Sequence, residues 1–150
     1  MKYVLAAALA LPAFSTLAAQ AVDPSIAVPV SGTWTYAPVA NGSEARFADS
    51  SARLQLTLRC VRATRKVSIS KPAAGAVPNL TIWTSSVSRS LPASFNPATS
   101  LATAEVTATD PILDAIAFSR GRFAVNAAGV PSLVLPPWAD VARVVEDCRA

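Results

Sequence analysis

The chain of 150 residues contains no histidine. This absence excludes the Ser-His-Asp and Cys-His arrangements, in which an imidazole takes the proton from the nucleophile. It also removes a common zinc ligand, and the two cysteines and scattered carboxylates that remain lack the spacing of a metal site. The sequence therefore predicts a protein without catalytic residues, without a bound metal and without a cofactor.

Long hydrophobic runs are also missing beyond the first residues. Lys2 is followed by apolar residues at positions 3–11, and residues 19–21 (Ala-Gln-Ala) have the small-x-small pattern of a cleavage site. The run is too short to span a bilayer, and the whole pattern is typical of a secretory signal peptide. We therefore predict a signal peptide over residues 1–21 with cleavage after Ala21, a periplasmic or secreted protein, and no membrane span.

Cysteine is scarce, and the two that occur, Cys60 and Cys148, lie far apart. In an exported chain, a single pair of cysteines most simply forms one disulfide. Closing a loop of roughly 90 residues would stabilise the fold by about 4–5 kcal/mol in the chain-entropy treatment, which is comparable to the net stability of a small domain. The alternative is two free, buried thiols.

Alternation of apolar and polar residues is strictest at residues 53–60, which predicts a half-buried antiparallel strand. The apolar side chains of that strand are Leu54, Leu56, Leu58 and Cys60. Shorter alternating stretches predict strands near residues 33–36, 45–48, 67–69, 80–84, 101–108, 121–126 and 132–135. Residues 85–99 contain several serines and two prolines, and we expect a long connection there.

Two helices are expected, both late in the chain. Asp110 followed by Pro111 has the form of an N-cap and a first helical residue, which predicts a short helix over residues 111–118. A second helix beginning near Trp138 carries one apolar stripe, formed by Val141, Val144, Val145 and Cys148. The predicted fold is mainly β: an antiparallel β-sandwich or open barrel with one short helix and a C-terminal helix stapled by a disulfide. It forms a single domain over residues 32–150, after an extended linker over residues 22–31.

Acidic residues are absent between Asp49 and Glu105, whereas cations are frequent there. The arginines that we expect on one strand face and its adjoining turn are Arg53, Arg59, Arg62 and Arg65. Such a surface is a candidate site for an anionic envelope polymer, for lipid headgroups or for an acidic envelope protein. The alternative is an ordinary solvated face. Nucleic acid is not expected as a partner, because the chain is predicted to be exported and has no nucleic-acid-binding motif.

A second candidate is the pair Arg120 and Arg122, which flank Gly121. In a strand these two guanidinium groups would share one face and repel each other unless an anion lay between them. That partner is either an internal carboxylate or an external carboxylate or phosphate. The internal candidates are Asp114, Glu146 and Asp147.

Two features of the sequence raise enzymatic alternatives. Ser68-Ile69-Ser70-Lys71 matches the S-x-x-K string of penicillin-binding enzymes, but strand alternation points Ser68 and Lys71 to opposite faces and the companion motifs are missing. A hydrolase that uses carboxylates alone, acting on an envelope polymer, would need two acids facing each other across a cleft. The other alternative is a purely structural domain.

The end of the chain resembles a group of uncharacterised exported proteins of sphingomonad-type alphaproteobacteria. The resemblance is carried by residues 117–123 (Ala-Phe-Ser-Arg-Gly-Arg-Phe), 135–138 (Leu-Pro-Pro-Trp) and 143–149 (Arg-Val-Val-Glu-Asp-Cys-Arg). The layout of the chain is distantly similar to the invasion-associated locus B family and to an accessory family of type VI secretion, both β-sandwich-like. The resemblance implies an exported β domain with an envelope role, and it carries over no catalytic residue. We therefore expect a non-enzymatic envelope-associated binding or accessory module.

Overall fold

The computed structural model describes residues 22–150, so the predicted signal peptide and its cleavage site lie outside the described residues. Within that part, nine strands form one continuous sheet, and every pair of neighbouring strands is antiparallel. The strands are β1 (Gly32–Val39), β2 (Gly42–Asp49), β3 (Leu54–Val61), β4 (Lys66–Pro72), β5 (Asn79–Trp83), β6 (Ser88–Asn96), β7 (Leu101–Thr107), β8 (Phe123–Ala127) and β9 (Val130–Leu135). The helices are α1 (Pro111–Ala117) and α2 (Ala139–Arg149).

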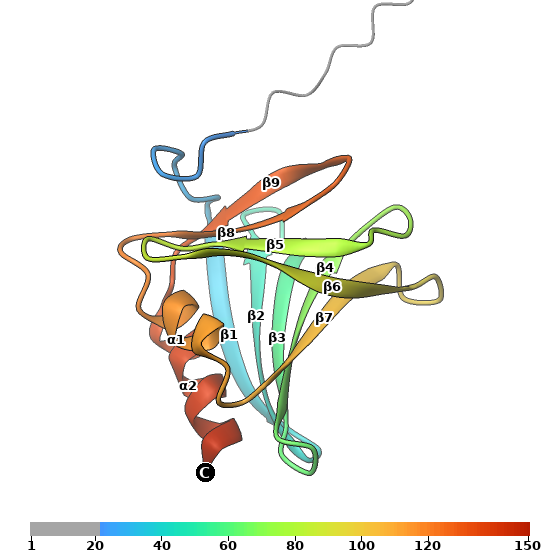
Figure 1. Ribbon diagram of the computed structural model, residues 1–150, viewed down its shortest axis with the longest axis vertical. Helices are drawn as coiled ribbons and strands as arrows, with labels where there is room; N and C mark the ends of the chain where they lie inside the picture. Colours follow the sequence, from blue (N-terminus) through green and yellow to red (C-terminus); the bar gives the residue numbers. More distant parts are fainter. Residues whose placement is uncertain (1–21) are drawn as a thin grey trace, which may run out of the picture.

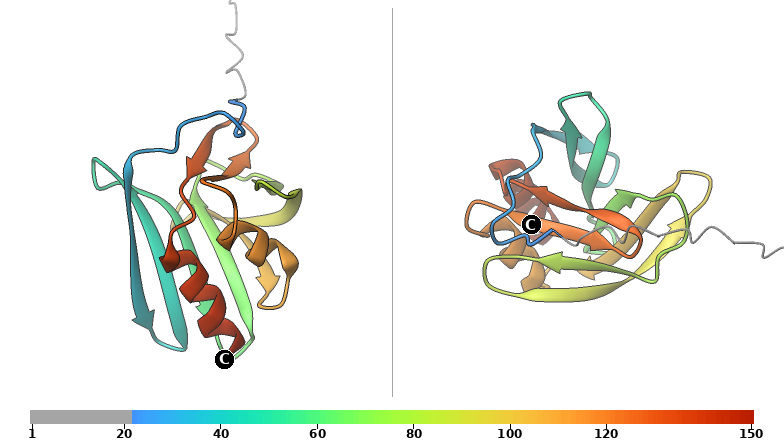
Figure 2. Two further views of the ribbon diagram at one scale, coloured as in Figure 1. Left: turned by 90° about the vertical axis from the view of Figure 1, so that its left-hand side faces the viewer. Right: turned by 90° about the horizontal axis from the view of Figure 1, so that it is seen from above.

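The sheet is curled into a half-barrel. Its strand order is β1-β2-β3-β4-β7-β6-β5-β8-β9. Strands β1 to β4 run along the long axis of the molecule, whereas β5 and β8 cross above them at a steep angle (Figure 1). The view from above shows the same curl (Figure 2). The predicted fold, mainly antiparallel β, is therefore confirmed in its open-barrel form.

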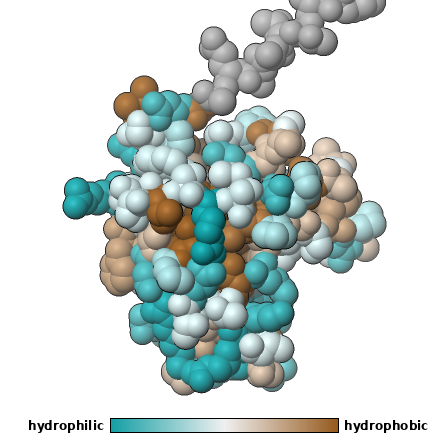
Figure 3. Space-filling model, in the orientation of Figure 1, coloured by the Kyte–Doolittle hydropathy of each residue, from teal (hydrophilic) through white to brown (hydrophobic). Residues whose placement is uncertain are grey.

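The core lies on the inner face of the half-barrel, where alternation along the strands places the apolar side chains. Leu56, Leu58 and Cys60 are fully buried, as the pattern of β3 predicts. The indole of Trp34 packs between Phe47 and Phe123, with ring centroids 5.3 Å and 6.4 Å apart respectively. In the space-filling view, apolar side chains gather in the middle of one face and polar ones surround them (Figure 3).

Helix α2 packs along strands β1 to β3 and closes one side of the half-barrel (Figure 2). Its buried residues are the predicted stripe, Val141, Val144, Val145 and Cys148. Cys148 forms a disulfide with Cys60 of β3, with the two Cα atoms 5.4 Å apart, so the predicted covalent link is confirmed. Within residues 22–150, both helices fall short of the length and hydrophobicity that a membrane-crossing helix needs.

The predicted connection over residues 85–99 is wrong, because most of it forms strand β6. Residues 88–92 of this strand pair with β5, and residues 93–96 pair with β7 on the other side. Pro92 stands where the pairing changes sides, a position at which its missing N–H breaks no regular ladder. Leu91 is the only buried residue of β6. The sequence of this strand therefore shows little of the apolar–polar alternation by which a strand can be predicted.

Candidate functional site

The four arginines expected on one face do not form one surface. Arg53 precedes β3 and Arg62 follows it, so the two lie at opposite ends of an eight-residue strand, roughly 30 Å apart. Arg53 forms an ion pair with Asp49, with Nη2 and Oδ2 3.1 Å apart. Arg59 lies opposite Glu44 in the β2–β3 register, and Glu44 itself pairs with Arg46.

Arg62 and Arg65 bind the end of helix α2. Arg62 Nε donates to the carbonyl oxygen of Asp147 at 3.3 Å, and Arg65 Nη2 donates to that of Arg149. The last carbonyl groups of a helix lack intrahelical donors and carry its negative dipole end, so cations are favourable there. These two arginines therefore have a structural role, and the predicted anion-binding face loses its geometric support.

The expectation that Arg120 and Arg122 share a strand face is also wrong. Strand β8 begins only at Phe123, and Gly121 has a φ of 73°, which turns the chain between the two arginines. The backbone N–H of Arg120 donates to Ser85 Oγ at 2.8 Å, whereas the guanidinium of Arg122 donates to the carbonyl oxygen of Ala27. Arg122 therefore ties the N-terminal segment to the half-barrel instead of meeting an anion beside Arg120.

The carboxylates expected as internal partners have other contacts. Asp114 forms an ion pair with Arg149, with Oδ1 and Nη1 2.8 Å apart. Asp147 accepts a hydrogen bond from the hydroxyl of Tyr36 at 2.6 Å, which lowers the pKa of that carboxyl. The guanidinium carbon of Arg143 lies 3.9 Å from the centre of the same tyrosine ring. These contacts fasten α1 and α2 to each other and to β1.

The alternative of a hydrolase would need two acids facing each other across one cleft. Three hollows among residues 22–150 are lined by one acid each, which is Asp23, Asp114 or Asp49, so none of these three offers such a pair. Residues 22–150 also hold no group of three side chains of the kind that binds a metal.

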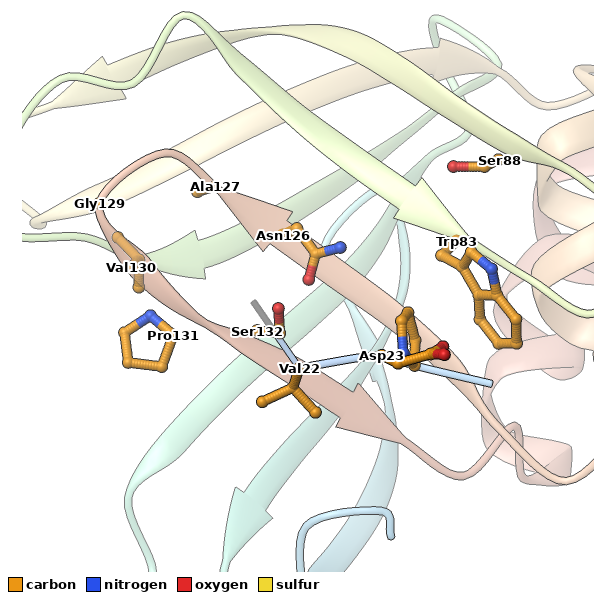
Figure 4. A pocket seen from close by; sticks show the side chains of 11 residues that line it. Val22, Asp23, Trp83, Ser88, Asn126, Ala127, Gly129, Val130, Pro131 and Ser132 are labelled. Carbon is orange, nitrogen blue, oxygen red and sulfur yellow. The ribbon is translucent and has the colours of Figure 1, made fainter. Parts of the chain in front are cut away.

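A hollow of about 720 Å³ lies on the outer side of strands β5, β8 and β9. Alternation along β5 turns Leu80 and Ile82 inward and leaves Thr81 and Trp83 on the outer face. Trp83 lies beside the hollow, with Asn126 of β8 and Ser132 of β9 nearby and Asp23 of the N-terminal segment next to the indole (Figure 4). One amide, hydroxyl groups and an aromatic ring thus line the same space.

The hollow continues into a second one of about 350 Å³ across the same strands. Thr81, Ser90 and Asn126 line this extension, and Thr81 Oγ1 lies 3.4 Å from Ser90 Oγ. The side-chain oxygen of Asn126 is buried and has no hydrogen-bond partner within residues 22–150. Asp23 is the one charged side chain lining either hollow. The two hollows together, which we call the Trp83 groove, combine apolar with polar uncharged residues and carry little charge.

Sequence reasoning did not select Trp83 or Asn126. The signal for Trp83 is present, since a large aromatic side chain at the outward position of an alternating strand has no place in the core. No comparable signal marks Asn126, because it joins Thr81 only through the pairing of β5 with β8.

Comparison with protein-family models, with curated proteins and with solved structures gives no match for this chain. The resemblance in the C-terminal residues therefore stays a prediction.

Proposed function

We propose that this chain is an exported, non-enzymatic binding domain of the cell envelope, and that its ligand is a neutral glycan held in the Trp83 groove. The observation that carries the proposal is the outward indole of Trp83 beside the amide of Asn126 and a row of hydroxyl groups. The predicted signal peptide and the single disulfide support export, because disulfides persist in oxidising compartments.

The chemistry of the groove favours a sugar over an anion. An aromatic face offers an apolar platform to the C–H face of a pyranose ring, while amide and hydroxyl groups exchange hydrogen bonds with its hydroxyls. Asp23 is the only charged side chain in the lining, and cleavage after Ala21 would add only the α-amino group of Val22, so the groove offers an anion no arginine or lysine side chain and carries little net charge. This argues for a neutral ligand in place of the anionic polymer predicted from the arginines.

The test is binding of neutral oligosaccharides, measured by isothermal titration calorimetry with cellotriose, laminaritriose and tri-N-acetylglucosamine as probes. We expect at least one of them to bind, and Trp83→Ala to weaken that binding at least tenfold. Trp138→Ala is the matched control, because Trp138 is 44% exposed at the start of α2 and lies outside the groove. The Trp138→Ala variant should bind the sugar with the same affinity as the unaltered protein.

Two results would contradict the proposal. If none of the three sugars binds while a polyanion such as heparin does, the arginine-based prediction would replace it. If neither class binds and Trp83→Ala only lowers the melting temperature, the outward tryptophan serves stability and the purely structural alternative stands.

A further inference from the structure

Lys71 is a largely buried lysine whose ammonium group has no protein partner among residues 22–150. It follows Val67 and Ile69 on the inner face of β4, and only 6% of its surface is exposed. No hydrogen bond or ion pair joins its ammonium group to any of residues 22–150, although its strand neighbour Lys66 pairs with Glu105. A buried charge with no partner costs free energy, so its presence requires an explanation.

The side chain of Lys71 lines a hollow of about 380 Å³ at the open end of the half-barrel. The walls are mostly apolar and come from the N-terminal segment, the end of β4 and strand β9: Val30, Pro72, Val130, Pro131 and Leu133. The polar lining residues other than Lys71 are Asp49, Arg53, Gln55 and Ser132. The hollow thus combines apolar walls with the ammonium group of Lys71, which has no protein partner among the described residues.

Asp49 is not the missing counter-ion. Its carboxylate accepts hydrogen bonds from the backbone N–H and the Nε of Arg53 at 3.0 Å and 3.1 Å, and from Gln55 Nε2 at 2.7 Å. These contacts hold the pKa of Asp49 below its usual value, and the backbone bond from Arg53 is the main cause. Because the carboxylate of Asp49 and the guanidinium of Arg53 neutralise each other, the positive charge of Lys71 has no counter-ion among the residues that line the hollow.

We propose that this hollow binds a small organic acid, with the carboxylate on the ammonium group of Lys71 and the hydrocarbon body against the apolar walls. The leftover positive charge selects an anion, and the apolar walls select one with a hydrophobic body. Inorganic phosphate fits less well, because it is strongly hydrated and only one unneutralised cation is offered to it. The hollow shares the wall residues Val130, Pro131 and Ser132 with the Trp83 groove. The inference still does not depend on the proposed glycan site, since neither Trp83 nor Asn126 lines the hollow around Lys71.

The full chain contains three lysines, Lys2, Lys66 and Lys71, so the amine can be observed directly. Burial lowers the pKa of Lys71, and a bound carboxylate would raise it again. We would label the lysine Cε atoms with ¹³C, assign the signals with Lys66→Arg, and titrate the pH with and without hexanoate. The expected result is a saturable shift of the Lys71 signal and a higher pKa for Lys71 alone.

Hexanamide is the matched control ligand, because it keeps the hydrocarbon body and lacks the charge. It should leave the Lys71 pKa unchanged, and Lys71→Met should weaken hexanoate binding at least tenfold. Lys71→Arg should retain most of the affinity, and Lys66→Met, on the exposed side of the same strand, should retain all of it.

The proposal is overturned if hexanamide binds as well as hexanoate, or if Lys71→Met binds hexanoate unchanged. Inorganic phosphate that shifts the Lys71 signal at the same concentration as hexanoate would also overturn it, because the site would then recognise charge alone. The titration itself uses the wild-type protein, and the exposed Lys66→Arg variant serves only to assign the signals, so the result does not depend on how a substitution of Lys71 affects folding.

Discussion

The disulfide between Cys60 and Cys148 makes a quantitative prediction about stability. The two residues are 88 positions apart, and the link joins β3 to the last helix of the fold. In the chain-entropy treatment, opening a loop of this length lowers the free energy of unfolding by about 4–5 kcal/mol. The double variant Cys60→Ala/Cys148→Ala should lose about this much, which is a large part of the stability of a domain of this size.

Urea unfolding followed by circular dichroism measures this loss. The matched comparison is the unaltered protein in its reduced form, because it keeps both sulfur atoms in the core and lacks only the covalent link. We expect the reduced protein and the double variant to lose similar amounts. A loss below about 1 kcal/mol in both would refute the reasoning, since it would mean that the unfolded chain is already constrained without the link.

Three further predictions concern single residues. Lys71→Met should raise the stability at pH 7 by up to about 1 kcal/mol, because it removes a partly desolvated charge. Because the pKa of Lys71 is lower in the folded than in the unfolded chain, the unfolded chain binds more protons at a pH between these two values, and the wild-type protein becomes more stable as the pH rises. The difference in free energy of unfolding between Lys71→Met and the wild type should therefore narrow as the pH approaches 10.5. Asp110→Ala should cost about 1–2 kcal/mol in a thermal melt, because Asp110 accepts from the N–H of Ile112 at 2.9 Å as the N-cap of α1. Gly42→Ala should cost about 2 kcal/mol or more in urea unfolding, because the added Cβ would lie 2.0 Å from the carbonyl oxygen of Cys60.

The elements that could be predicted from the sequence are those with a strong local signal. Strict alternation identifies β3, because one face of that strand is buried and the other is not. The Asp110–Pro111 pair identifies the start of α1, because capping depends on residues close together in the chain. The disulfide was predictable because the chain contains only two cysteines.

Strand β6 shows where local signals fail. Its residues are held by β5 on one side and by β7 on the other, so its structure depends on partners distant in sequence. Serine and proline in such a stretch look like a connection when the partners are unknown. Tertiary pairing overrides the weak β-propensity of these residues.

The roles of Arg62 and Arg65 were within reach of the sequence. A disulfide between Cys60 and Cys148 brings the turn after β3 to the end of the last helix, and cations bind favourably at helix C-termini. These two facts together predict that the arginines cap α2. The prediction of an anion-binding face treated the same charges as a surface property and did not use the disulfide as a distance constraint.

The Lys71 hollow illustrates the opposite limit. Alternation in β4 does place Lys71 on the same face as Val67 and Ile69, so the sequence shows a charge at an inward position. The sequence does not show whether that position meets a carboxylate, solvent or a cavity, because the walls opposite come from residue 30 and from β9. A charged residue at an inward position of a strand therefore indicates a candidate binding site. Which ligand that site can hold becomes clear only when the residues of the opposite walls are known. For this reason the binding experiments rest on the hollows and not on the charge pattern of the chain.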